Sequence, residues 1–128
     1  MKIKIKVGYT QGDRGPGGSG YSSFDGWYSG AKQDPVIEFE VETEKPLDPK
    51  QVADMVYVAD NAPYDLGSGV AAKIREALQA GPIHHSLSVG DTVEVDGVPL
   101  AVADMGFESL AQADAHTRAK MVRFGIAV

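Results

Sequence analysis

An Asp-Gly dipeptide between two β-prone runs is the feature of this sequence that most restricts its fold. The first run is 92–95 (TVEV), and the second is 98–103 (VPLAVA). Asp96 and Gly97 between them suit the two-residue turn that joins antiparallel strands, because both central positions of that turn have positive φ. The sequence therefore predicts a β-hairpin here. Its side chains expected in the core are Val93, Val95 and Val102.

Turns are also predicted on both sides of this hairpin. Upstream, Gly90 accepts a positive φ, and the Asp91 carboxylate can bond the backbone of the turn. Downstream, Gly106 marks a bulge or a turn that returns Phe107 to the core. The stretch 84–110 is therefore expected to form one hairpin region bounded by turns.

Two short motifs beside these turns resemble those of a known family. They are HSLSVGDTV over 85–93 and GFESL over 106–110. Both are similar to motifs of the YodL-like domains of phage, plasmid and other mobile-element proteins, in which Ser-Leu-Ser-Val-x-Asp-Val precedes a strand pair and Gly-Phe-x-x-Leu follows it. The resemblance implies a mobile-element context and assigns no catalytic residue. Residues 1–80 lie outside it.

Composition excludes several kinds of chemistry. The chain has no cysteine, which excludes disulfides, thiolate catalysis and cysteine-based zinc sites. The net charge of -6 and the pI near 4.9 argue against direct nucleic-acid binding, because nucleic-acid binders carry a basic patch. The same acidity leaves open an acidic mimic of nucleic acid.

No window of the sequence approaches the roughly 18 apolar residues that a membrane-spanning helix needs. The lysine-bearing N-terminus MKIKIKVG also lacks the apolar core of a signal peptide. We therefore expect no membrane association and a cytoplasmic location, in the bacterial cytosol or, for a phage product, the host cytosol.

Two alternating runs predict a pair of complementary strands. From Lys2 to Tyr9, lysines alternate with apolar residues, as in a strand with one exposed face. From Val36 to Glu44, glutamates alternate with apolar residues in the same way. The acidic face of the second strand is expected to lie beside the lysine face of the first.

The segment 10–30 between these strands is expected to be a flexible loop that binds a partner. It contains seven glycines between 12 and 30 and four aromatic residues. Loops of this length inside small domains are often functional, and Trp, Tyr and Arg are common in binding hot spots. The predicted contact residues are Arg14, Tyr21, Phe24, Asp25, Trp27 and Tyr28, of which Trp27 or Tyr28 should be partly exposed.

Two alternatives to this interpretation remain open. In the first, two of the aromatic side chains cap the sheet and the rest are solvated. In the second, the binding surface is the face around His85 and Phe107. The run GPGGSG over 15–20 formally matches a dinucleotide fingerprint, but no strand directly precedes it and no helix opens within it, so no cofactor is expected.

Three helices complete the expected fold. The first begins with Asp48, Pro49 and Gln51, a combination typical of a helix N-terminus. It ends at 61–63, and a second helix follows from about 68 to 80. Ser109 is expected to cap a third helix that ends near 119.

The last residues, 122–128, alternate and predict a terminal strand. This order of elements predicts a single α+β domain over 1–128. A small, mostly antiparallel sheet would carry two to three helices on one face.

The three histidines are expected to be structural. His84 and His85 should point to opposite faces of a strand, so at most one of them can join His116. Asp91, Asp104 and Asp114 could complete a metal site, but the histidine spacing favours none. Asp91 is expected to bond the turn backbone, and Asp54 and Asp60 are expected on the solvated side of their helix.

The sequence as a whole favours a binding protein. We expect a small phage or mobile-element accessory protein that binds a protein partner, for example an anti-defence or host-takeover factor. The alternatives are a metal- or histidine-dependent hydrolase and an acidic nucleic-acid mimic. No catalytic residue is assigned, and the oligomeric state is left open.

Overall fold

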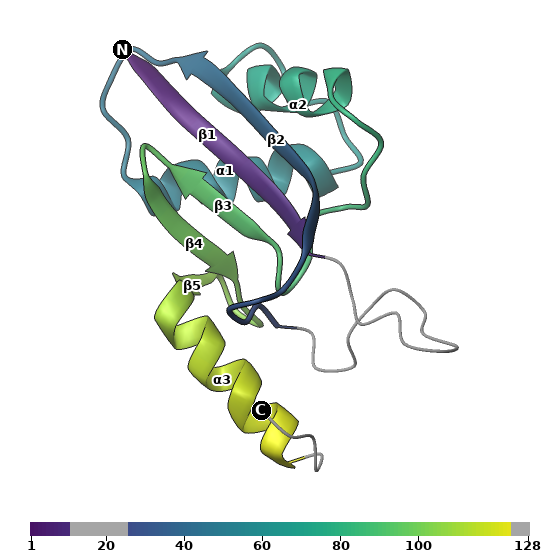
Figure 1. Cartoon of the computed structure of the whole chain (residues 1–128). Helices are drawn as coiled ribbons and strands as arrows, with labels where there is room; N and C mark the ends of the chain where they lie inside the picture. Colours follow the sequence, from purple (N-terminus) through teal and green to yellow (C-terminus); the bar gives the residue numbers. More distant parts are fainter. Residues whose placement is uncertain (11–25, 124–128) are drawn as a thin grey trace.

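A five-stranded antiparallel sheet forms the centre of the computed structural model, which describes residues 1–10 and 26–123 (Figure 1). The strand order is β2-β1-β3-β4-β5, and each neighbouring pair is antiparallel. The strands are β1 (Lys2–Thr10), β2 (Gln33–Glu42), β3 (Thr92–Val95), β4 (Val98–Val102) and β5 (Phe107–Ser109). The three-residue β5 was not predicted, because so short a strand leaves no alternating pattern.

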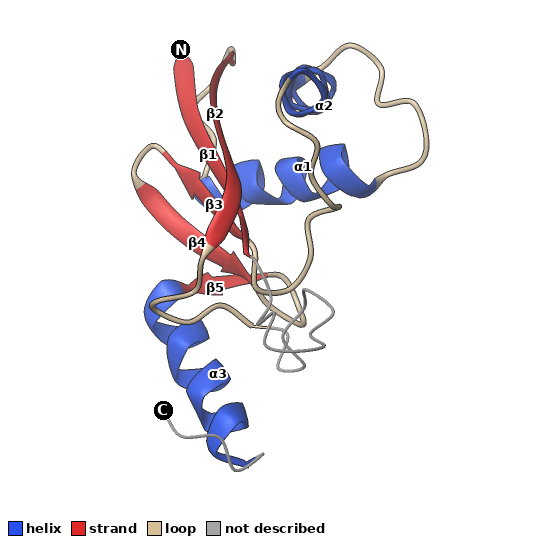
Figure 2. Ribbon diagram, turned by 45° about the vertical axis from the view of Figure 1, so that its right-hand side comes forward, coloured by secondary structure: helices blue, strands red, loops and turns tan. Residues whose placement is uncertain are grey.

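Three helices accompany the sheet: α1 (Pro49–Asn61), α2 (Val70–Ala80) and α3 (Leu110–Arg123). Helices α1 and α2 lie together on one side of the sheet, whereas α3 extends away from the end formed by β4 and β5 (Figure 2). The expected α+β class is therefore confirmed, with two of the three helices covering one face. Within residues 1–10 and 26–123, no helix combines the length and apolar character that crossing a bilayer requires.

The two N-terminal strands pair as their charges predict. Lys2, Lys4 and Lys6 lie opposite Glu42, Glu40 and Glu38 on the face of the sheet away from α1 and α2. The other face of β1 carries Ile3, Ile5, Val7 and Tyr9, all of them buried. Burial of each such aliphatic side chain stabilises the fold by about 1.5 to 3 kcal/mol.

The first two helices begin and end close to the predicted positions. Asp48 accepts a hydrogen bond from the Lys50 N–H, and Gln51 accepts one from the Asp48 N–H, which completes a capping box. The C-terminal end of α1 is held by Arg75 of α2. Its guanidinium donates to the carbonyls of Ala59, Ala62 and Tyr64, which would otherwise lack helical partners.

The C-terminal helix is longer than predicted. Ser109 caps it as expected, through reciprocal hydrogen bonds with Gln112. The helix continues past the predicted end at Ala119 to Arg123, so the predicted strand is wrong at Val122, and 124–128 lie outside the described residues. The buried series Ala113, Thr117 and Met121 repeats every fourth residue, and Lys120 and Arg123 in the last turn suit the negative end of a helix dipole.

The predicted hairpin is confirmed. Asp96 and Gly97 have φ of 47° and 83°, as a two-residue turn requires, and Val93, Val95 and Val102 are buried. The turn is also joined to β1, because Lys4 and Asp96 exchange two hydrogen bonds of 2.9 Å. The hairpin therefore continues the sheet that the N-terminal strands begin.

Replacing Gly97 with serine should lower the free energy of unfolding by about 1 kcal/mol or more. A Cβ at this position would meet no atom within 4 Å, so the loss would come from the positive φ alone. Gly69→Ser is a matched control, because Gly69 is equally open, has φ of -83° and is the N-cap of α2, where serine is favoured. Urea denaturation of both variants tests this, and equal stabilities would contradict it.

Candidate functional site

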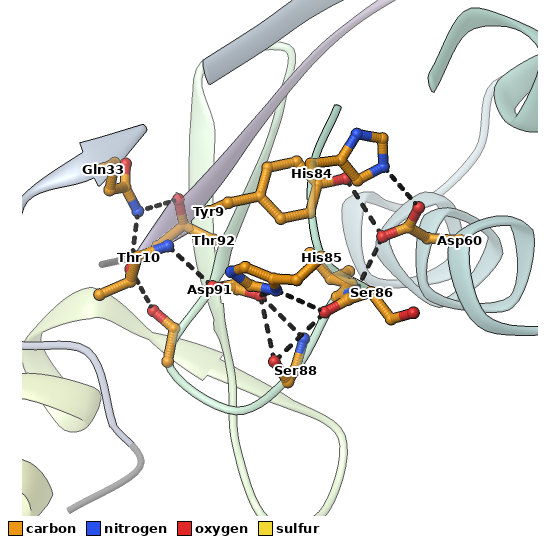
Figure 3. Close-up of polar contacts among 12 residues, drawn as sticks. Tyr9, Thr10, Gln33, Asp60, His84, His85, Ser86, Ser88, Asp91 and Thr92 are labelled. Atoms are coloured by element: carbon orange, nitrogen blue, oxygen red, sulfur yellow. Dashed lines mark hydrogen bonds and ion pairs between the residues drawn. The ribbon is translucent and has the colours of Figure 1, made fainter. Parts of the chain in front are cut away.

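The segment before β3 places both adjacent histidines against Tyr9 of β1 (Figure 3). The ring centroids of His84 and His85 lie 4.5 and 5.3 Å from that of Tyr9. The expectation that the two histidines point to opposite faces is therefore wrong. Residues 82–88 form a loop rather than a strand, so the alternation of a strand does not apply to them.

Asp60 of α1 binds three groups at the centre of this cluster. One carboxylate oxygen accepts from the Tyr9 hydroxyl at 3.1 Å and from the Leu87 N–H at 2.8 Å, and the other lies 2.9 Å from His84 Nε2. Its side chain is only 7% exposed, so the prediction that Asp60 is solvated is wrong. Residues 84–87, which are distant from α1 in sequence, cover its C-terminal end. The periodicity of a helix predicts which residues face the sheet, but it cannot predict that such a loop covers Asp60.

The His84 ring lies between two acceptors. Its Nδ1 is 2.9 Å from the Pro82 carbonyl, and its Nε2 is 2.9 Å from Asp60. A carbonyl and an ionised carboxylate only accept hydrogen bonds, so a His84 nitrogen can bond either of them only as a donor. Burial, reinforced by the charge and the hydrogen bond of Asp60, raises the pKa of Tyr9, which keeps its hydroxyl a donor.

Asp91 is a second buried carboxylate, 1% exposed. It accepts from the Thr10 and Ser88 N–H groups at 2.8 Å each, which confirms the expected turn bond, and it lies 3.7 Å from His85. Burial raises its pKa to about 6, although the two N–H groups and His85 oppose that shift. Asp91 therefore connects the end of β1 to the turn before β3.

This cluster holds the fold together and does not form a metal site in the residues that the structure describes. His116 lies apart from the other two histidines and bonds Glu108 at 2.9 Å. Across 1–10 and 26–123, no three His, Cys, Asp or Glu side chains are placed to bind a metal ion. Asp104 lies near Lys120 and Asp114 bonds Ser29 and Arg118, so neither joins a histidine.

A different site lies at the surface beside β4, where two hollows adjoin. The first, of about 270 Å³, is lined by Trp27, Met105 and His116, among others, and the second, of about 320 Å³, by Tyr57 and Phe107 among others. The residues common to both are Val89, Val102, Ala103 and Asp104. We call these two hollows and Met105 the Met105 surface.

Met105 is at the tip of a tight turn. The Ala103 N–H donates to the Gly106 carbonyl at 2.9 Å, and Gly106 has φ of 75°, which favours glycine. This turn leaves the Met105 side chain 91% exposed, while Phe107 packs partly against the core. The predicted return of Phe107 to the core is therefore confirmed.

Trp27 is fixed beside this turn by α3. Its carbonyl accepts from the Thr117 hydroxyl at 2.9 Å. Gly26 next to it has no room for a side chain, since a Cβ would lie 2.2 Å from the Thr117 hydroxyl oxygen. Ser29 extends the attachment by donating its N–H to Asp114 at 2.8 Å, and this bond lowers the pKa of Asp114.

The predicted contact residues fall into three groups. Trp27 and Tyr28 are both partly exposed, as expected, and Trp27 and Phe107 line the Met105 surface. His85 instead belongs to the buried cluster. The residues outside the described part of the chain are Arg14, Tyr21, Phe24 and Asp25. The sequence analysis did not predict Met105 as a contact residue. The only feature of the sequence that could have indicated its exposure was its position between Asp104 and Gly106 in a predicted turn.

No family model, curated protein or solved structure matches this chain. The resemblance of 85–93 and 106–110 to YodL-like domains therefore stays a prediction.

Replacing Asp60 with alanine should lower the free energy of unfolding by about 3 kcal/mol or more, because Tyr9, His84 and Leu87 all lose the buried group that they bond. Asp54→Ala is the matched control, since Asp54 lies on the same helix and is exposed. That control should change stability by about 0.5 kcal/mol or less. Equal losses in urea denaturation would contradict the central role of Asp60.

The Asp91 carboxyl should titrate with a midpoint of about 6 when followed by carbon NMR. Since the folded-state pKa is above the ordinary value of 3.8, the folded protein binds the extra proton. The contribution of Asp91 to stability is thus full below pH 3.8 and is lost as the pH rises through about 6. Asp91→Asn should remove this titration, and a midpoint near 3.8 in the unchanged protein would contradict the effect of burial.

Proposed function

We propose that this protein binds another protein through the Met105 surface. The observation that carries the proposal is the exposed Met105 side chain, held by a tight turn between two hollows. Methionine adapts to irregular partner surfaces, and tryptophan is among the residues that contribute most to binding energy. Because hydrogen bonds already order the backbone of the turn and of Trp27, association costs little backbone entropy there.

Charges around the surface specify the partner's chemistry. Asp54, Asp104 and Glu108 lie at the two hollows, where Asp104 pairs with Lys120 and Glu108 with His116. The protein as a whole carries a net charge of -6. A partner with an apolar centre and a basic rim fits this arrangement, and its association rate should fall as salt is added.

A phage or mobile-element accessory role is the biological context that we propose for this binding, for example as an anti-defence or host-takeover factor. Its support is the resemblance to YodL-like domains. The two stretches that carry the resemblance meet at the second hollow, where Val89 and Phe107 both line the wall. Backbone hydrogen bonds from Gly90 to Val102 and from Val102 to Asp91 hold the first stretch against β4.

The two alternatives have less support. A histidine-dependent hydrolase needs an imidazole nitrogen available to a substrate, whereas both nitrogens of the buried His84 already face acceptors. An acidic nucleic-acid mimic needs a face of one sign. The glutamates of β2 instead alternate with the lysines of β1 across the sheet.

Site-specific photo-cross-linking tests the proposal. A photoreactive phenylalanine analogue at position 105 should capture a discrete bacterial protein, whereas the same analogue at Ile83 should not. Ile83 is a matched control, because its side chain is fully exposed and lies outside the two hollows. The captured protein is then purified and titrated against variants by calorimetry.

In that titration, Met105→Asp should weaken binding roughly tenfold or more, because it places a charge in a desolvated contact. Ile83→Asp should leave the affinity unchanged, and both variants should keep the unfolding temperature of the original protein. Equal affinities for the two variants, or capture at both positions alike, would show that the partner binds elsewhere.

A further inference from the structure

Strand β2 has one side that no described strand occupies. It is the first strand in the order β2-β1-β3-β4-β5, and it pairs only with β1. Among residues 1–10 and 26–123, no hydrogen bond reaches the backbone of 36–42 from the side away from β1. This edge is at the opposite end of the sheet from the turn that carries Met105.

The hydrogen bonds identify which backbone groups face outward. Lys4 exchanges bonds with Asp96, so the backbone groups of Lys4 and Lys6 point toward β3, and those of the alternate residues of β1 point toward β2. On β2, the groups of Ile37, Phe39 and Val41 therefore point toward β1. The groups of Glu38, Glu40 and Glu42 point away from the sheet.

The same three residues also present their side chains on the face away from α1 and α2. The side chains of Glu38 and Glu42 are 71% and 61% exposed. A lysine of β1 lies beside each of the three glutamates on one side only. Each outward-facing pair of backbone groups thus carries an adjacent carboxylate that a second cation can approach.

We propose that this edge accepts an extended segment of a partner protein that has lysine or arginine at every second position. Such a segment would add a sixth strand, and its basic side chains would lie opposite the glutamates, as those of β1 do. A second copy of β2 is a poor occupant, since antiparallel self-pairing would place glutamates opposite glutamates. The surface differs from the Met105 surface and does not depend on it.

Amide hydrogen exchange with a designed peptide tests this proposal. The probe is a short peptide, blocked at both ends, that alternates lysine with threonine. On addition of the peptide, the amides of Glu38, Glu40 and Glu42 should gain protection of about tenfold or more. The amides of Ile37, Phe39 and Val41 should change little, because they already donate to β1. This alternation separates strand addition from attraction to the acidic surface alone.

Three controls sharpen the result. A peptide methylated on the nitrogens that would face β2 should not bind, Glu40→Lys should weaken binding roughly tenfold, and Glu40→Gln should weaken it less. Met105→Asp should bind as the original protein does, which separates this edge from the Met105 surface. Binding of the methylated peptide, uniform protection along β2, or no binding at millimolar peptide would each overturn the proposal.

Discussion

Two buried carboxylates, Asp60 and Asp91, join β1, α1 and the loop before β3. Each accepts hydrogen bonds from segments far apart in sequence: Asp60 from Tyr9 and Leu87, and Asp91 from Thr10 and Ser88. Burying a carboxylate is unfavourable unless several donors surround it, so the two sites specify one arrangement of β1, α1 and the loop before β3. Without these two carboxylates, the loop would lose the hydrogen bonds that Leu87 and Ser88 donate to them.

The same arrangement positions the surface that we propose for binding. Two contacts fix the turn at Gly90. The Asp91 carboxylate accepts from the Ser88 N–H, and the Gly90 N–H donates to the Val102 carbonyl of β4. Gly90 also lies close to the backbone of Gly26, next to Trp27. The loop before β3 therefore contributes both to the buried carboxylate cluster and to the Met105 surface. A substitution in the cluster should alter the shape of that surface.

Local patterns predicted the parts of the fold that local forces determine. The Asp-Gly turn, the capping box at Asp48 and the lysine-glutamate pairing of β1 and β2 each depend on residues close in sequence or on strict alternation. Asp60 and the histidine pair were wrongly placed because their partners are distant in sequence. Helix α3 was predicted too short because the alternation of 122–128 favoured a strand, whereas the helix includes the buried Met121 and ends at Arg123. The candidate surface was predicted only in part: Trp27 and Phe107 were named, whereas Met105 becomes informative only when the neighbouring hollows are seen.

The pairing of β1 has a consequence for how the protein is made. Ile5 pairs with Phe39 of β2 on one side and with Val95 of β3 on the other. The two partners of β1 are therefore synthesised at very different times. During translation, β1 and β2 can form a hairpin early, but their apolar face stays uncovered until the helices and the second hairpin have emerged. Long-range pairing of this kind slows folding and exposes intermediates to aggregation. The lysines and glutamates on the opposite face of the β1–β2 hairpin would oppose aggregation of this intermediate until the rest of the chain is synthesised.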